Sequence, residues 1–461
     1  MKIIQVYAYE VLNSMGFPTI ACVIQTDTGA VGKVLIPTSS LHESKYACKS
    51  LVDKDENSYF GYGVKKAVNL INQNIANLLL GLDVTNQKRI DELLLLLDNS
   101  VDHRYYGANT LLAVSLAASK AAANELHLSL YKYLREKLLN NTESKYLLPT
   151  VFFNILNIET NEEKQLQQFF IVPLGFKNLN EVFIITNKIF HNLKKELIKN
   201  NESFLIDGYG AFAVKLKNLE AYIELLIKVI IDSGYKVGND GNENEIALAI
   251  NFKANQVYDP INKIYQLTLP INDENLKLIY NQSEFLNLVS SLINKYHFLC
   301  VQDPFSMFDT QNYVDLTKDV SNNMQITADE VYASNPYLIK LGLEKHLTNS
   351  VLIKLDEVAT LSEIIEAVLY AKKANWTIIV ASRYSDTEDS YIVDLAVGLG
   401  TGQIQVGGFS RSERTSKYNR LIEIMIQERQ NAVFLGKKAF YNLTQTKSND
   451  EDDNLNAQAK E

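Results

Sequence analysis

Glycine and proline are scarce in this sequence, with 20 and 8 of 461 residues, below the roughly 7% and 5% of average usage. Few loops can therefore be lined with glycine. Cysteine is rarer still, and Cys22, Cys48 and Cys300 form no Cys-x-x-Cys pair. This spacing argues against a disulfide framework and against a zinc site. We expect three buried, reduced thiols.

Long hydrophobic runs and basic clusters are also missing. No stretch of about 18 uninterrupted apolar residues occurs, the length that a membrane-spanning helix needs. The N-terminal segment MKIIQVYAYEVLNS lacks the long apolar core of a signal peptide. The net charge is -9 without a long basic run, which argues against nucleic-acid binding. We predict a cytoplasmic protein with no membrane segment and no nucleic-acid partner.

The remaining composition is that of an ordinary globular protein, with 46% hydrophobic and 21% charged residues. Residues 2–36 alternate apolar and polar side chains and are broken at 16–18 and 28–29. This pattern predicts a three-stranded meander. Helical periodicity follows to about residue 138, and segment 107–126 is small and apolar nearly all round. Such a helix is predicted to lie buried between two layers.

From about residue 149 the pattern changes to apolar strands that alternate with helices. The helix at 360–374 begins with Thr360 and Glu363 at capping-box spacing. Continuously apolar strands that alternate with helices indicate a mostly parallel sheet covered on its outside. The number of repeats favours an α/β barrel. The polar and acidic C-terminal segment is predicted to be a disordered tail.

Polar residues close the apolar runs of six consecutive barrel strands. Active sites of such barrels lie where the strands end. Any one of these residues by itself is more readily an ordinary strand terminator, but the series predicts one shared site. Its members are Asn251, Gln302 with Asp303, Asp329 with Glu330, Lys354, Ser382 with Arg383, and Gln405.

Two kinds of chemistry are open at this rim. Asp329, flanked by Asp303, Glu330 and two amides, would make a weak Mg²⁺ site, because a hard cation favours several carboxylates. Lys354 is a candidate general base if neighbouring cations lower its pKa towards neutrality. An ion pair between Lys354 and Asp329 across adjacent strand ends is the competing interpretation.

Four segments resemble the enolase family in order and spacing: YGANTLLAVSLAASKAAA, NSVLIKLDEVATLSE, DTEDSYIVDLAVGLGTGQI and SRSERTSKYNRL. The likeness runs from residue 2 to about 425. It implies an α+β cap domain over 1–138, a (β/α)8-type barrel with an antiparallel start over 139–440, and a disordered acidic tail over 441–461. It also implies dehydration of 2-phosphoglycerate to phosphoenolpyruvate in glycolysis, Mg²⁺ as cofactor, and a homodimer in most members.

Three functional positions of the family are retained. By the resemblance, Lys354 matches the base lysine, Arg383 the substrate-binding arginine, and Asp329 the third carboxylate that holds the catalytic Mg²⁺. The enolase superfamily is known to use a lysine or histidine base with Mg²⁺ to stabilise the enediolate.

The family's other functional positions are replaced. The first two metal carboxylates fall at Asn251 and Gln302. The glutamate that assists departure of the hydroxyl falls at Gly208 in IDGYGAF, where enolases have Asp-Glu-Gly-Gly, and a second glutamate falls at Gln168. Gln405 replaces a lysine that contacts the substrate carboxylate, Ser382 replaces a histidine, and Tyr384 replaces the serine beside the arginine. Leu41 replaces the metal-binding serine of the mobile loop. The catalytic-loop histidine falls in the segment NIETNEEK, which contains no histidine.

These losses predict that Lys354 stays protonated, because little remains to lower its pKa. They indicate an enolase-like pseudoenzyme that acts as a binding or scaffold protein, with Mg²⁺ binding weak or absent. The alternative is a slow or altered enolase. It would use Lys354, Arg383 and the carboxylates of the rim, with Tyr384 and Asp386 as new polar contacts.

Assembly is left open by the sequence. The arginine of the family's interfacial ion pair falls at Tyr9, and its glutamate partner falls near Met425 and Ile426. A homodimer, a heterodimer with a catalytic enolase, and another protein partner are all compatible with this. The acidic segment from Ser448 to Glu461 is a candidate interaction motif.

Overall fold

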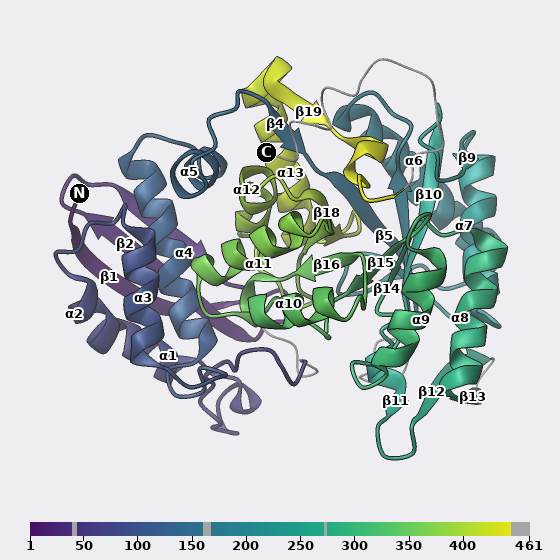
Figure 1. The fold of residues 1–461 in the computed structure, drawn as a ribbon, viewed down its shortest axis with the longest axis horizontal. Coiled ribbons are helices and arrows are strands. Elements are labelled where there is room, and N and C mark those ends of the chain that lie inside the picture. The colour runs from purple at the N-terminus through teal and green to yellow at the C-terminus, as the bar shows by residue number, and fades with distance from the viewer. Residues whose placement is uncertain (39–43, 160–166, 272–273, 444–461) are drawn as a thin grey trace.

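A computed structural model describes residues 1–38, 44–159, 167–271 and 274–443 of the chain. In Figure 1 an N-terminal cap lies beside a larger barrel. The predictions for Leu41, for most of NIETNEEK and for the tail from residue 444 onward fall outside the described residues.

The cap starts with the predicted meander. Strands β1 (Ile3–Leu12), β2 (Pro18–Thr26) and β3 (Val31–Leu35) pair antiparallel in that order. The α-helices that follow in the described part of the cap are α1 (Lys65–Leu70), α2 (Ala76–Leu79), α3 (Gln87–Leu97), α4 (Ala108–Glu125) and α5 (Leu130–Tyr133).

Helix α4 is buried between the sheet of the cap and the barrel, as its small apolar residues predict. A Cβ at Gly32 of β3 would lie 2.1 Å from the carbonyl oxygen of Ala117 and 2.3 Å from the amide nitrogen of Ala121. The sheet can therefore approach α4 only because residue 32 is glycine. Towards the barrel, Ser119 Oγ hydrogen-bonds to Tyr391 Oη at 2.7 Å.

The second part is a closed barrel. Its eight strands, in barrel order, are β5 (Thr150–Ile158), β6 (Gln168–Pro173), β10 (Glu245–Asn251), β14 (Cys300–Gln302), β15 (Gln325–Ala328), β16 (Ser350–Ile353), β17 (Thr377–Ala381) and β18 (Gly402–Gly407), and β18 pairs back onto β5. Strand β6 runs antiparallel to both β5 and β10, whereas the following pairs are parallel. The expected antiparallel start is confirmed.

Helices cover the outside of the barrel (Figure 1). They are α6 (Leu179–Lys199), α7 (Leu219–Asp232), α8 (Gln282–Tyr296), α9 (Thr310–Val320), α10 (Pro336–Glu344), α11 (Leu361–Lys373), α12 (Tyr391–Gly398) and α13 (Ser412–Glu428). The side chain of Thr360 accepts a hydrogen bond from the amide of Glu363 at the start of α11, as the capping spacing predicts.

Short strands complete the barrel part. Strands β7 (Leu205–Ile206) and β8 (Phe212–Val214) extend the barrel sheet beside β5, and β9 (Lys236–Val237) pairs with β10. Strand β4 (Tyr146–Leu148) pairs with β19 (Ala432–Phe434). Strands β11 (Tyr258–Asp259), β12 (Ile264–Ile271) and β13 (Glu274–Asn281) form a separate three-stranded antiparallel sheet.

The structure differs from the sequence prediction at the start of the tail. Residues 441–443, which composition assigns to a disordered segment, pack on the barrel. Leu443 is buried, and Tyr441 donates its hydroxyl to the carbonyl oxygen of Trp376. Two large apolar side chains in a polar segment are enough to anchor it.

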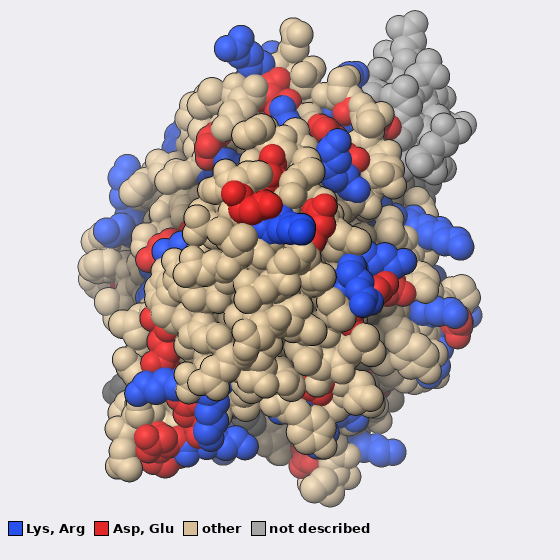
Figure 2. Space-filling model, turned by 90° about the vertical axis from the view of Figure 1, so that its left-hand side faces the viewer, with Lys and Arg blue, Asp and Glu red and all other residues tan. Residues whose placement is uncertain are grey.

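Other sequence predictions concern the thiols and the surface. All three cysteines are buried and reduced, as expected. None of the helices in the described part of the chain is long and apolar enough to cross a bilayer. On the face of the molecule in Figure 2, Lys and Arg are interspersed with Asp and Glu around a broad uncharged area, rather than gathered into a basic patch.

Asp91 of α3 ties the cap to the barrel at the N-terminus of α11. Its Oδ2 accepts hydrogen bonds from the amide and the hydroxyl of Ser362, at 3.0 and 2.6 Å, and its Oδ1 accepts from Ser115 Oγ at 2.6 Å. Burial raises the pKa of this carboxyl to about 6, although the hydrogen bonds oppose the shift.

We predict that Asp91→Asn removes part of the pH dependence of stability. Because the folded-state pKa of about 6 lies above the ordinary value of 3.8, the folded protein binds this proton more tightly than the unfolded chain. The free energy of unfolding should therefore fall as the pH rises from about 4 to about 6, by on the order of 3 kcal/mol from this group. Denaturant unfolding across this range measures the difference between variant and parent.

The matched control is Asp83→Asn. Hydrogen bonds from Thr85 lower the pKa of Asp83 below its usual value, so this substitution should leave the slope between pH 4 and 6 in place. Parallel curves for the parent and Asp91→Asn would contradict the prediction.

Candidate functional site

The carboxyl ends of the barrel strands meet at one rim, and the predicted residues lie there. Asn251 and Gln302 end β10 and β14, Gln405 lies in β18, and Asp329 and Lys354 directly follow β15 and β16. The structure brings all five into two contact groups, one of amides and one of charged side chains.

The amide group is a hydrogen-bonded chain. Gln302 donates from Nε2 to Gln405 Oε1 at 2.8 Å, and Asn251 donates from Nδ2 to Gln302 Oε1 at 3.3 Å. The backbone amide of Lys253 donates to Asn251 Oδ1 at 2.8 Å. Each of the three amide oxygens thus already accepts a hydrogen bond from the chain. Gln168 is buried on β6 in register with Asn251.

Lys354 belongs to the charged group, where its ammonium contacts Asp329 Oδ2 and lies 3.7 Å from Glu357 Oε1. Burial lowers the pKa of Lys354, but the attraction of Asp329 and Glu357 outweighs it, so the pKa lies above its ordinary value. The ion pair that the sequence offers as the competing interpretation is therefore formed. A lysine in this state holds its proton at neutral pH.

Arg383 is held by two carboxylates from the turn after β16. Its Nε donates to Asp356 Oδ1 at 2.6 Å and its Nη2 donates to Glu357 Oε1 at 3.2 Å. The anion-binding fork that the sequence assigns to Arg383 is thus occupied by the protein's own acids. Burial, followed by repulsion from Asp329, raises the pKa of Glu357 to about 8, although Lys354 and Arg383 oppose the shift.

Asp356 and Glu357 are site residues that sequence reasoning missed. Both are buried, and they immediately follow Leu355 in the segment KLDE. The available signal was a pair of adjacent acids, separated from Lys354 of the rim by one residue. Their partners come from the next strand end, which the local pattern does not reveal.

Asp303 and Glu330, the flanking carboxylates, are also tied into the structure. Asp303 Oδ1 accepts a hydrogen bond from the amide of Asp329 at 2.9 Å, and Glu330 accepts one from the side chain of Asn255. Burial, followed by repulsion from Asp329, raises the pKa of Asp303 well above its usual value and that of Glu330 to about 7.

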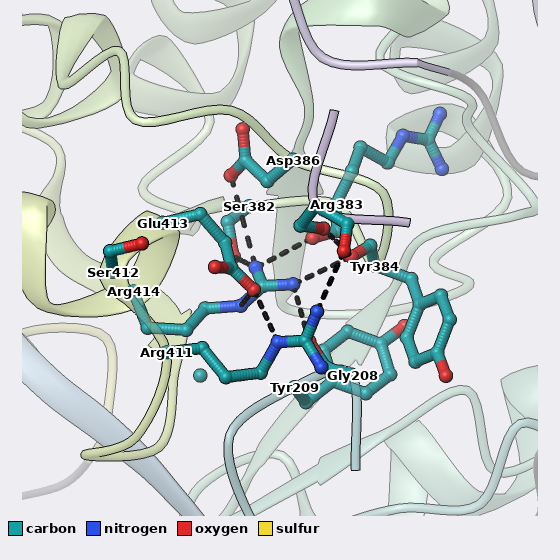
Figure 3. A network of polar contacts seen from close by, with 12 residues as sticks. Gly208, Tyr209, Ser382, Arg383, Tyr384, Asp386, Arg411, Ser412, Glu413 and Arg414 are labelled. Atoms are coloured by element: carbon teal, nitrogen blue, oxygen red, sulfur yellow. Dashed lines mark hydrogen bonds and ion pairs between the residues drawn. The ribbon is translucent and has the colours of Figure 1, made fainter. Parts of the chain in front are cut away.

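Arg414 of α13 joins the loop that contains Gly208 to the loop after β17 (Figure 3). It is fully buried and donates to Ser382 Oγ at 2.8 Å, to Gly208 O at 2.8 Å and to Tyr384 O at 2.7 Å. Arg414 lies in the segment SRSERTSKYNRL, which contributes to the family resemblance, but the sequence alone assigns it no role. A buried arginine on a helix is recognised only when the carbonyl groups around it are known.

Asp386 is not a free polar contact. It is buried, and its Oδ2 lies 3.3 Å from Lys417 Nζ and 3.8 Å from Arg414 Nη1. The structure thus gives Asp386 a role in loop packing, and its candidate role in a new substrate site stays a prediction.

The residues present do not fit the Mg²⁺ that the resemblance implies. Of the three matched positions, Asn251 and Gln302 offer amide oxygens that already accept hydrogen bonds, and Asp329 is paired with an ammonium. Among the described residues no group of three or more His, Cys, Asp or Glu side chains is arranged to hold a metal ion. A hard divalent cation favours several carboxylate oxygens.

We predict that millimolar MgCl₂ leaves the melting temperature within about 1 °C of its value in EDTA, since a ligand stabilises the folded state only if it binds. Differential scanning fluorimetry measures this, with NaCl at matched ionic strength as reference. The double variant Asn251→Asp/Gln302→Glu should instead gain stability on addition of Mg²⁺. Equal stabilisation of the parent and this variant would contradict the prediction.

Comparison with known proteins identifies the family. The model described as "Enolase, N-terminal domain" matches residues 3–134, and "Enolase, C-terminal TIM barrel domain" matches residues 145–443. A Mycoplasma pneumoniae protein named Enolase is 35% identical over 452 residues, covering 97% of this chain and 98% of its own length.

Two further relatives agree. The Mycoplasma genitalium protein named Enolase is 36% identical over 447 residues, covering 96% of both chains. The Mycoplasmopsis pulmonis protein of the same name is 36% identical over 459 residues, covering 96% of this chain and 99% of its own. With both family domains matched and relatives aligned along nearly the whole length, the chain belongs to the enolase family.

Proposed function

We propose that this chain is an enolase-family protein that has lost ordinary turnover of 2-phosphoglycerate and acts as a binding or scaffold protein. The observation that supports this most strongly is the ion pair of Lys354 with Asp329. A general base must be unprotonated to accept a proton. The neighbours of Lys354 instead hold its pKa above the ordinary value.

Two other groups that the reaction needs are also absent. Gln405 supplies a neutral amide that is bonded to Gln302, where the resemblance places a lysine. Gly208 has no side chain to act as an acid. Loss of a general acid typically lowers a rate about 10²–10⁴-fold, and loss of a preorganised electrostatic contact about 10²–10³-fold. These effects do not simply multiply, but together they leave little catalysis.

The second candidate is an enolase that converts 2-phosphoglycerate to phosphoenolpyruvate with Mg²⁺. The relatives favour it, because proteins named Enolase align at 35–36% identity along nearly the whole chain, and by this criterion it is the better supported function. It requires that substrate binding free Lys354 from Asp329 and Arg383 from Asp356 and Glu357.

Turnover decides between the two candidates. We predict a rate at least about 10⁴-fold below that of the Mycoplasma pneumoniae relative assayed beside it at saturating Mg²⁺. The variant Gln405→Lys should not restore activity by itself, because Lys354 stays paired. Formation of phosphoenolpyruvate, followed by its ultraviolet absorbance, measures both.

The control for this assay is Lys354→Met, since activity that survives this substitution comes from contaminating host enzyme. A rate within about tenfold of the relative's that disappears in Lys354→Met would overturn the proposal and establish the enolase candidate.

We further propose a cytoplasmic protein that assembles as a homodimer, or as a heterodimer with a catalytic enolase. In place of the family's interfacial ion pair, Tyr9 of β1 and Ile426 of α13 present exposed apolar side chains. Burial of apolar groups can replace an ion pair without loss of stability.

We predict a dimer whose dissociation constant is insensitive to salt, because an apolar interface, unlike an ion pair, is not screened. Analytical ultracentrifugation at low and at about 0.5 M NaCl measures it. The variant Tyr9→Lys places a charge at the matched position and should weaken the dimer. A monomer in the parent under both conditions excludes the homodimer.

A further inference from the structure

The ring of Tyr384 fills the space that a side chain at residue 208 would need. A Cβ built on Gly208 would lie 2.2 Å from Cε2 of Tyr384, 2.3 Å from its Cζ and 2.7 Å from its hydroxyl oxygen. Gly208 lies in the turn between β7 and β8, and Tyr384 follows β17, so the two residues meet at the carboxyl end of the barrel. Any residue larger than glycine at 208 must displace the ring.

Tyr209 packs against Tyr384 and brings two cations to the same corner. The two rings meet edge-on, with centroids 5.1 Å apart and an interplanar angle of 66°. Lys253 Nζ lies 4.7 Å from the centroid of the Tyr209 ring, and Arg414 Cζ lies 5.6 Å from it. Cations at such distances attract an aromatic face. The two cations therefore help to hold the Tyr209 ring against the Tyr384 ring.

Hydrogen bonds fix the backbone at Gly208 and at Tyr384. Arg414 donates one hydrogen bond to Gly208 O and another to Tyr384 O, as Figure 3 shows. Ser14 of the cap donates to Tyr384 O at 3.2 Å. Because one buried guanidinium joins the two loops, Tyr384 cannot withdraw from Gly208 by a shift of its backbone alone.

We propose that Gly208, Tyr209 and Tyr384 form an aromatic plug, in which the chain itself occupies the corner of the barrel mouth that would hold an acidic side chain and part of a ligand. The plug rests on the proposed function only in taking this corner as part of the family's ligand site. A single substitution at residue 208 cannot restore an acid there, since Tyr384 takes up its volume.

The proposal predicts that the effects of substitutions at 208 and 384 are coupled. Gly208→Ala should lower the melting temperature by about 4 °C in the parent, because the added methyl group collides with the ring. In a Tyr384→Ser background the same substitution should cost less than about 1 °C, because the ring is gone. In Tyr384→Phe, which keeps the ring and lacks the hydroxyl, the loss should remain near 4 °C.

Gly342 of α10 provides the matched control. A Cβ there would lie 2.3 Å from Cε1 of Tyr332, a fully buried tyrosine whose hydroxyl bonds to Thr348. Gly342→Ala should therefore lower the melting temperature equally in the parent and in Tyr384→Ser, since it meets another ring. If Tyr384→Ser does not fold, Tyr384→Ala is the second ringless background.

Two outcomes would overturn the plug. One is a Gly208→Ala variant as stable as the parent, which would mean that the ring of Tyr384 swings away freely. The other is an equal loss with and without the ring, which would place the collision elsewhere. The coupling between residues 208 and 384 is measured through the melting temperature, not through turnover. It can be absent in a protein without turnover, or present in a protein with normal turnover, so this test is independent of the proposed function.

Discussion

Neutralisation of buried charge is the constraint on which the carboxyl end of the barrel depends. Asp329, Asp356, Glu357 and Arg383 are buried, and the partly buried Lys354 lies against them. A buried charge without a partner is strongly destabilising, so these groups must lie against one another. Each pair also joins two strand ends: Lys354 with Asp329 links β16 to β15, and Arg383 with Asp356 links β17 to the turn after β16. The rim is thus held together by the same contacts that balance its charge.

This arrangement has a chemical consequence. In this structure Lys354 and Arg383, the cations that an anionic substrate would meet, both contact the protein's own acidic side chains. The amides of Asn251, Gln302 and Gln405 likewise satisfy one another. Hydrogen-bonded amides can be buried without a counter-ion, whereas carboxylates at those positions would need a metal or another cation. The three amides can therefore be buried without the ion that the family's chemistry uses.

The architecture could be predicted from the sequence because it follows from local periodicity. Alternation over residues 2–36 specified the meander, and a helix apolar on all sides at 107–126 had to lie between two layers. Continuous apolar strands between helices indicated a covered parallel sheet. The end of the ordered chain was misjudged, because Tyr441 and Leu443 are two apolar side chains in a polar segment and their partners lie far away in the sequence.

The sequence by itself located the polar strand ends of the site, and the resemblance to the enolase family identified which carboxylates and which lysine are replaced there. It could not determine what those groups bind. The contacts of Arg383 with Asp356 and Glu357, of Arg414 with Gly208 and Tyr384, and of the Tyr384 ring with residue 208 join loops that are separated along the chain. Only the closure of the barrel brings those loops within a few ångströms, and at that distance burial and charge decide which side chains are committed to the structure.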